Sequence, residues 1–155
     1  PTPKTPLNPM RSYTTQTGTR ALLKAGVRME GLETAVMDPV IDAVAVAYAS
    51  TPQDVVITSA LDGRHTPGSL HYDGHALDFR VWGLSDVPRA ATRIKQLLGG
   101  TYDVIAEQNA DGSYSHIHVE YDPDTFDPPD AVAVASSVPP ILIIALLSYL
   151  AYRYS

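Results

Sequence analysis

The sequence contains no cysteine, and this absence removes several classes of functional site at once. Disulfides, zinc sites built from cysteine, iron–sulfur clusters and catalytic thiols all require this residue. Any metal ion bound by the protein must therefore be held by histidine and carboxylate side chains.

Basic residues are also scarce, with 11 lysines and arginines against 17 aspartates and glutamates and a net charge of −6. Proteins that bind nucleic acid usually present a basic face that neutralises phosphates. We therefore expect no nucleic-acid partner. Because 45% of the residues are hydrophobic and 18% are charged, the composition is that of a folded chain rather than a disordered one.

The 155 residues suffice for one domain with a sizeable core, and the sequence divides into three parts. Residues 1–20 are rich in proline and threonine and are expected to form an extended N-terminal arm. Residues 21–127 hold all five histidines and most of the periodic pattern, so we expect them to form the folded domain. Residues 128–155 are expected to form a proline-rich hinge and a hydrophobic C-terminal tail.

The tail contains 22 consecutive uncharged residues, 131–152. About 20 apolar residues cross a bilayer as a helix, but Pro139 and Pro140 interrupt this run. The part after Pro140 predicts a hydrophobic helix that is too short to cross a bilayer alone. Two interpretations stay open. Apolar character on all sides and three tyrosines near the end favour a membrane-associated tail, and the alternative is a buried terminal helix or an oligomer contact.

Periodicity in the middle of the chain predicts a helix, two strands, a second helix and a hairpin. Ser85 is a candidate N-cap of the second helix, and an Asp-Gly pair marks the hairpin turn. The predicted segments are helix 31–49, strands 54–59 and 76–82, helix 85–98, and hairpin strands 102–107 and 115–121. This order predicts an α+β fold in which helices flank a small antiparallel sheet.

Two of the predicted strands carry ionisable side chains opposite their apolar face. Alternation places Asp78 on this polar face in one strand, and His116 and His118 on it in the other. His71 precedes Asp78 by seven residues, and Gly74 between them permits a tight turn. If the two strands are neighbours, the side chains of His71, Asp78 and His118 converge on one point.

Two imidazoles and one carboxylate with an open fourth position form the ligand set of a catalytic zinc site. His116 would lie beside such a metal and could move a proton or stabilise an oxyanion. Glu107, on the paired strand, is an alternative general base. The opposing interpretation is that these histidines are ordinary surface residues. Against it, all five histidines fall within two windows, 65–75 and 116–118.

A more specific pattern runs from Ser69 to Asp78, which matches S-x-H-x-x-G-x-A-x-D without a gap and is followed downstream by His116-Ile117-His118. Together these motifs resemble the zinc peptidases of the M15 type, the D-Ala-D-Ala carboxypeptidase and phage endolysin group related to the hedgehog-like metal fold. The resemblance covers residues 30–123 approximately. It implies a hedgehog- or DD-peptidase-like fold and a Zn²⁺ cofactor.

The resemblance also implies roles for individual residues. His71, Asp78 and His118 would bind zinc, and His116 would be the catalytic residue beside the metal. Arg64 is the candidate substrate-binding arginine, although it lies two residues beyond the usual position. The remaining two histidines receive no role.

The implied substrate is a peptide bond that involves D-amino acids in the stem peptide of bacterial peptidoglycan. The enzyme would be either a DD-carboxypeptidase that trims the terminal D-Ala or an L-alanyl-D-glutamate endopeptidase that cuts within the stem. With the tail attached to a membrane or a virion assembly, it would act in a virion or at the bacterial cell envelope. The competing hypothesis is a catalytically idle, metal-stabilised structural or cell-wall-binding protein.

Overall fold

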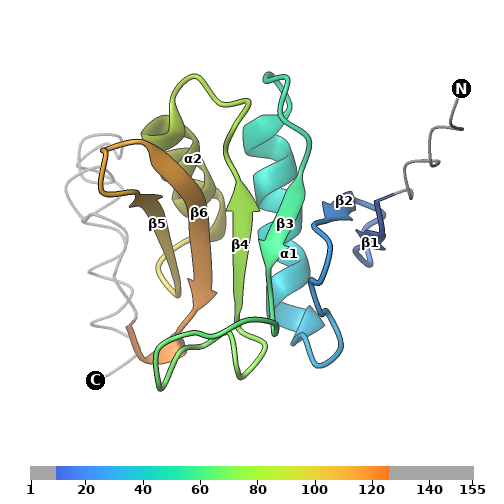
Figure 1. Cartoon of the computed structure of the whole chain (residues 1–155). Helices are drawn as coiled ribbons and strands as arrows, with labels where there is room; N and C mark the ends of the chain where they lie inside the picture. The colour runs from blue at the N-terminus through green and yellow to red at the C-terminus, as the bar shows by residue number, and fades with distance from the viewer. Residues whose placement is uncertain (1–9, 126–155) are drawn as a thin grey trace, which may run out of the picture.

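The computed structural model of the chain describes residues 10–125, which form six strands and two helices (Figure 1). In chain order the elements are β1 (Ser12–Thr14), β2 (Arg20–Leu23), α1 (Thr34–Tyr48), β3 (Val56–Ser59), β4 (Ala76–Arg80), α2 (Val87–Leu98), β5 (Tyr102–Gln108), β6 (Tyr114–Tyr121) and the 3-10 turn η1 (Pro123–Thr125).

The six strands form one sheet in the order β1-β2-β3-β4-β6-β5. β2 and β3 are parallel, and every other neighbouring pair is antiparallel. The predicted α+β class is confirmed, but the sheet is mixed and larger than the small antiparallel sheet that we expected. β1 and the first residue of β2 lie within segment 1–20, so the folded part begins earlier than the predicted end of the arm.

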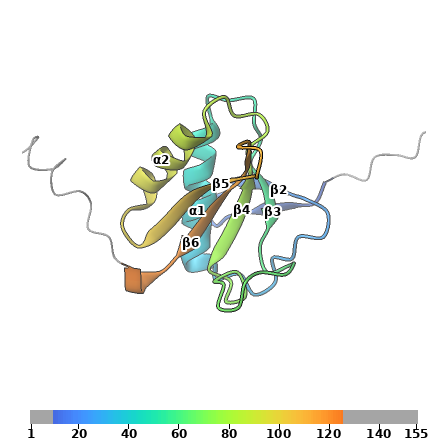
Figure 2. The ribbon, with the colours of Figure 1, turned by 60° about the vertical axis from the view of Figure 1, so that its left-hand side comes forward.

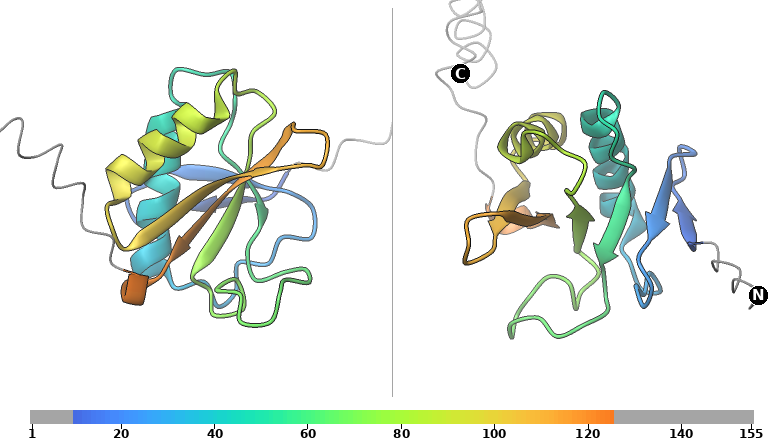
Figure 3. Two further views of the ribbon diagram at one scale, coloured as in Figure 1. Left: turned by 90° about the vertical axis from the view of Figure 1, so that its left-hand side faces the viewer. Right: turned by 45° about the horizontal axis from the view of Figure 1, so that its top comes forward.

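Both helices cover the same face of the sheet and leave the opposite face open (Figures 1 and 3). The helix-facing side forms the core, in which Ile41 of α1, Ile94 of α2, Phe79 of β4 and Ile117 of β6 are all fully buried. The loop between β3 and β4 lies on the side away from the helices, as Figure 2 shows. This loop therefore overhangs the open face.

The helix boundaries differ from the prediction by a few residues. α1 begins three residues later than expected, at Thr34. The N-cap of α2 is Asp86 rather than Ser85, because Asp86 Oδ1 accepts a hydrogen bond of 3.0 Å from the Arg89 amide. The hairpin between β5 and β6 is confirmed, with its turn between Gln108 and Tyr114.

Strand alternation positions the polar residues of interest. In β4, Leu77 and Phe79 face the helices, which directs Asp78 to the open face. β4 and β6 are neighbours as the convergence argument required, and Asp78 lies directly opposite His118 in their register. The open face of these two central strands therefore carries the candidate site.

The predicted C-terminal hydrophobic helix, the hinge and the tail from residue 126 onward lie outside the described residues, as do residues 1–9. Among residues 10–125, neither helix combines the length and the apolar character that crossing a membrane requires.

Candidate metal centre

Three side chains from separate elements meet on the open face. His71 comes from the β3–β4 loop, Asp78 from β4 and His118 from β6, and each offers one ligand atom within 4.8 Å of the other two. His71 is 2% exposed and Asp78 is 8% exposed, so the cluster is largely withdrawn from water. The predicted metal-ligand set is thus brought together by the fold.

The ring of His71 is oriented by the loop that carries it. Its Nδ1 lies 2.7 Å from the carbonyl oxygen of Ala60. Because a carbonyl oxygen only accepts hydrogen bonds, Nδ1 carries the proton and Nε2 is left with a free lone pair. Nε2 lies 3.3 Å from Asp78 Oδ1. Such a hydrogen bond on the far nitrogen is the usual way in which proteins orient a metal-binding imidazole.

His116 lies beside the three candidate ligands, with its Nε2 3.5 Å from Asp78 Oδ1. Its Nδ1 lies 2.9 Å from Ser115 Oγ, and the Ser115 hydroxyl donates to the backbone carbonyl of Glu107. With the hydroxyl hydrogen on that carbonyl, Nδ1 of His116 is the donor to Ser115. The lone pair of His116 therefore also lies on Nε2 and faces the site.

His118 contacts carboxylates through both ring nitrogens. Nδ1 lies 2.8 Å from Asp78 Oδ1, and Nε2 lies 3.1 Å from Glu120 Oε2. Burial alone would lower the pKa of His118, but the hydrogen bonds and negative charges of the two carboxylates outweigh it and raise this pKa above its ordinary value.

Asp78 is the centre of this arrangement. Burial acts to raise the pKa of its carboxyl group, but contacts with the surrounding histidines, above all the hydrogen bond from His118, hold that pKa well below the ordinary value. Asp78 is therefore ionised at neutral pH. The lone pairs on Nε2 of His71 and of His116 face the same anionic oxygen of Asp78. These three electron-rich atoms repel one another, and a cation bound between them would stabilise the arrangement.

The site opens into a cavity of about 620 Å³. One wall is the loop segment 65–71, and the other is formed by the open faces of β5 and β6, which contribute Ile105, Glu107 and Glu120. Such a volume lies in the range of small-molecule and cofactor pockets, which is about 300–1,000 Å³.

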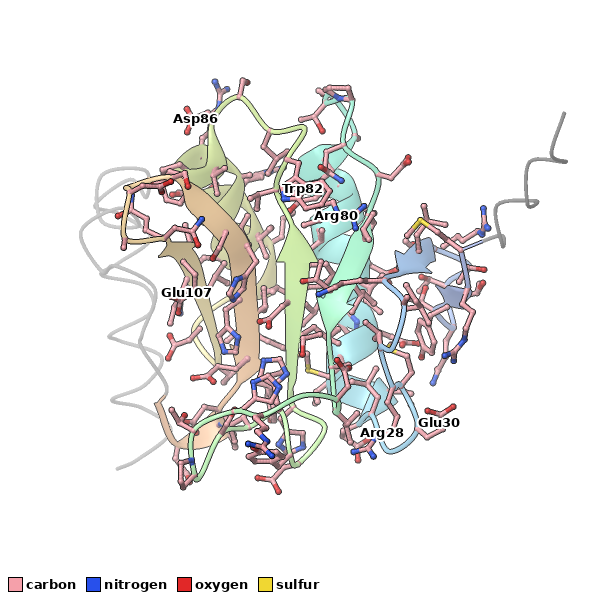
Figure 4. All side chains as sticks on the ribbon, in the orientation of Figure 1. Arg28, Glu30, Arg80, Trp82, Asp86 and Glu107 are labelled. Carbon is pink, nitrogen blue, oxygen red and sulfur yellow. The ribbon has the colours of Figure 1, made fainter. Side chains whose placement is uncertain are left out.

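The other two predicted site residues, Glu107 and Arg64, differ in their position relative to the cavity. Glu107 lies directly opposite His116 in the register of β5 and β6, is exposed and lines the cavity (Figure 4). It therefore borders the site, as its assignment as an alternative base requires. Arg64 is exposed and does not contribute to the cavity wall.

Sequence reasoning gave no role to His65, which nevertheless belongs to the site. Its ring stacks on that of His71 at a centroid distance of 3.9 Å and an interplanar angle of 11°. Its Nε2 lies 2.8 Å from the carbonyl oxygen of Asp62, which fixes the ring against the loop. The shared window of His65 and His71 was the only signal in the sequence that pointed to this contact.

Arg80, to which sequence reasoning gave no role, lies directly opposite His116 in the register of β4 and β6. Its guanidinium stacks over the ring of Trp82, 4.3 Å from the centroid, and Trp82 is 79% exposed (Figure 4). Within residues 10–125, Nε of Arg80 is buried and has no hydrogen-bond partner. The positively charged Arg80 thus lies on β4, the strand next to the one that carries His116.

Comparisons of the chain with family models, curated proteins and solved structures gave no significant match.

Proposed function

We propose that the protein is a zinc-dependent peptidase that cleaves bonds involving D-amino acids in the stem peptides of bacterial peptidoglycan. One observation carries the proposal: a buried imidazole, a partly buried imidazole and an ionised carboxylate converge at the edge of a cavity, with a third imidazole directed at the same oxygen. Purely structural histidines have no need of this arrangement, whereas a hydrolytic metal site requires it.

The chemistry of the three donors fits zinc. Nε2 of His71, Oδ1 of Asp78 and Nδ1 of His118 would hold the ion, and three protein ligands leave a position open for water. A bound zinc ion lowers the pKa of its water to near neutrality and polarises a carbonyl group.

His116 is the residue placed to move protons. Its Nε2 lone pair faces the site and can accept a proton from the attacking water while the water oxygen bonds to the carbonyl carbon of the substrate. The same proton is then delivered to the leaving amine as the C–N bond breaks. Glu107 lines the same cavity and is the alternative proton acceptor.

Recognition of the substrate needs a cation if the scissile bond lies next to a terminal carboxylate. Neither Arg80 nor Arg64 lines the cavity, but the position of Arg80, on the open sheet face opposite His116, favours it over the exposed loop residue Arg64. The choice of peptidoglycan as the polymer is supported by the motif resemblance of the segments around His71 and His118, not by the cavity itself.

The experiment that tests the proposal is digestion of purified muropeptides by the full chain, with zinc supplied and after its removal by a chelator. We expect zinc-dependent release of D-Ala or of a stem fragment, identified by mass spectrometry, and loss of this release in His116→Ala. If the zinc-loaded chain leaves all muropeptides intact, the competing hypothesis of a catalytically idle, metal-stabilised protein replaces this one.

A further inference from the structure

Glu120 is a cavity residue of β6 to which neither the motifs nor the proposed reaction assign a role. It lies two residues after His118 on the same strand, so both side chains project from the open face. Its Oε2 lies 3.1 Å from Nε2 of His118, and its side chain is 26% exposed. This carboxylate therefore contacts a candidate metal ligand from the side remote from Asp78.

Two carboxylates face the two nitrogens of one imidazole, and a metal binds only the neutral ring, which keeps a single proton. A carboxylate ion accepts hydrogen bonds and cannot donate them, and a neutral imidazole has one N–H to give. His118 faces Asp78 Oδ1 through Nδ1 and Glu120 Oε2 through Nε2. Which nitrogen holds the proton decides which nitrogen is free to bind a metal.

Geometry separates the two nitrogens. Nδ1 lies against Asp78 Oδ1, the oxygen that His71 and His116 also face, whereas Nε2 is turned toward Glu120. A metal bound by Nδ1 would replace the hydrogen between His118 and Asp78. The single remaining N–H would then be on Nε2, with Glu120 as its acceptor.

We propose that Glu120 is a positioning residue that accepts a hydrogen bond from Nε2–H of His118 and thereby presents Nδ1 to the metal. The inference rests on the metal site of the proposed function. It completes a pattern already seen in His71, whose remote nitrogen donates to the Ala60 carbonyl. Carboxylate partners of this kind fix the tautomer and the ring plane and strengthen the imidazole as a ligand.

Two alternatives make different predictions. If Glu120 were itself a metal ligand, its removal would change the coordination number of the ion. If it contributed only negative charge, then any nearby carboxylate would serve equally. Asp103 is the matched control for charge, because it lies directly opposite Glu120 in the register of β5 and β6 and pairs with Lys95 instead of His118.

The test measures Zn²⁺ affinity of the full chain by competition with a chromophoric chelator. We expect Glu120→Ala to weaken zinc binding by about 10- to 100-fold, Glu120→Gln to weaken it less because the amide oxygen still accepts, and Asp103→Asn to change it by less than about 3-fold. The Co²⁺ absorption spectrum of Glu120→Ala should keep the coordination number of the parent protein. A change in coordination number, or equal losses in Glu120→Ala and Asp103→Asn, would overturn the inference.

A second measurement needs no variant and so does not depend on folding of Glu120→Ala. Nitrogen-15 NMR of the zinc-loaded parent chain should show His118 protonated at Nε2 and metal-bound at Nδ1. Zinc on Nε2, or unchanged affinity in Glu120→Ala, overturns the role of Glu120 while the metal site stands. If the parent chain itself binds no zinc, the proposed function and this inference both fail, so the two failures are distinguishable.

Discussion

Nδ1 of His118 lies 2.8 Å from Oδ1 of Asp78, and the two residues are exact partners in the antiparallel register of β4 and β6. The contact joins positions 40 residues apart in the sequence through the pairing of two central strands. Because Phe79 and Ile117, which follow and precede these residues, are fully buried on the other face, a register slip would expose the core. The packing of the core thus fixes the geometry of the site.

Metal removal should destabilise the protein. The candidate ligands come from a loop and two strands, so an ion that binds them stabilises only the folded state. At free zinc about 100-fold above the dissociation constant, the gain in unfolding free energy is about 2.7 kcal/mol. We expect the melting temperature of the full chain to fall on chelation and to recover with added zinc. Identical melting in both conditions would show that no ion is bound.

Two histidine variants should separate metal binding from proton transfer. His118→Ala removes a ligand and should lose zinc and peptidase activity together. His116→Ala should keep its zinc, measured by elemental analysis, while kcat falls by about 10²- to 10⁴-fold, the usual effect of a positioned acid–base group. Full turnover by His116→Ala would shift the role of base to Glu107, and Glu107→Gln would then be the variant that loses activity.

The two candidate arginines can be compared in the same assay. Arg80 has a buried Nε without a hydrogen-bond partner in the described part of the chain and lies opposite His116, whereas Arg64 is exposed in the loop. We expect Arg80→Gln to raise KM for a substrate that ends in a carboxylate by at least about tenfold, the effect of losing a charge-assisted hydrogen bond. Arg64→Gln, which removes the same charge, should have little effect; the reverse result would support the sequence-based assignment of Arg64.

The candidate site was predictable because local alternation decides it. The polar face of β4 and β6 follows from the buried residues on either side of Asp78 and His118, and the turn before β4 follows from Gly74. These patterns span a few residues each and need only one assumption, that the two strands are neighbours. The hairpin was equally local, since its turn is marked by Asp-Gly.

The features that sequence reasoning missed depend on distant contacts. β1 and β2 are short, and β2 is held in the sheet by parallel pairing with β3, where Leu22 lies opposite Val56. No pattern near Leu22 in the sequence predicts Val56 as its partner. The roles of Ser115 and Glu120 depend on side-chain directions within one strand, which residue type alone does not specify.

The contact between β1 and α1 predicts a specific response to alkaline pH. Tyr13 donates a 2.6 Å hydrogen bond to the buried carboxylate of Asp38, and burial together with that carboxylate raises the pKa of Tyr13 to about 12. An unfolded tyrosine ionises near pH 10, so the folded state retains this proton between about pH 10 and 12. Stability contributed by the contact is therefore complete below pH 10 and is lost as the pH rises through 12.

Tyr13→Phe should remove that part of the pH dependence. At neutral pH it should cost about 1–3 kcal/mol of unfolding free energy, because Asp38 loses a donor and keeps the Gln16 amide. Urea unfolding of both proteins from pH 7 to 11.5 measures the difference between their unfolding free energies. The other tyrosines contribute equally to both proteins, so their contributions cancel in this difference. A constant difference across this range would show that Tyr13 does not hold its proton through Asp38.

Gly74 offers a final test of how the loop places His71 in the site. Gly74 has a φ of +74°, and a Cβ at this position would overlap the carbonyl oxygen of Gly31. Gly74→Ala must therefore move the turn that carries His71, and we expect weaker zinc binding as well as lower stability.

Gly112→Ala is the matched control, because Gly112 has a φ of +83° but open space around it. That variant should lose only about 1–2 kcal/mol of unfolding free energy, the cost of placing alanine in the left-handed region. Its zinc affinity should be unchanged. Equal zinc affinity in the two variants would show that the turn at Gly74 does not position the metal ligand.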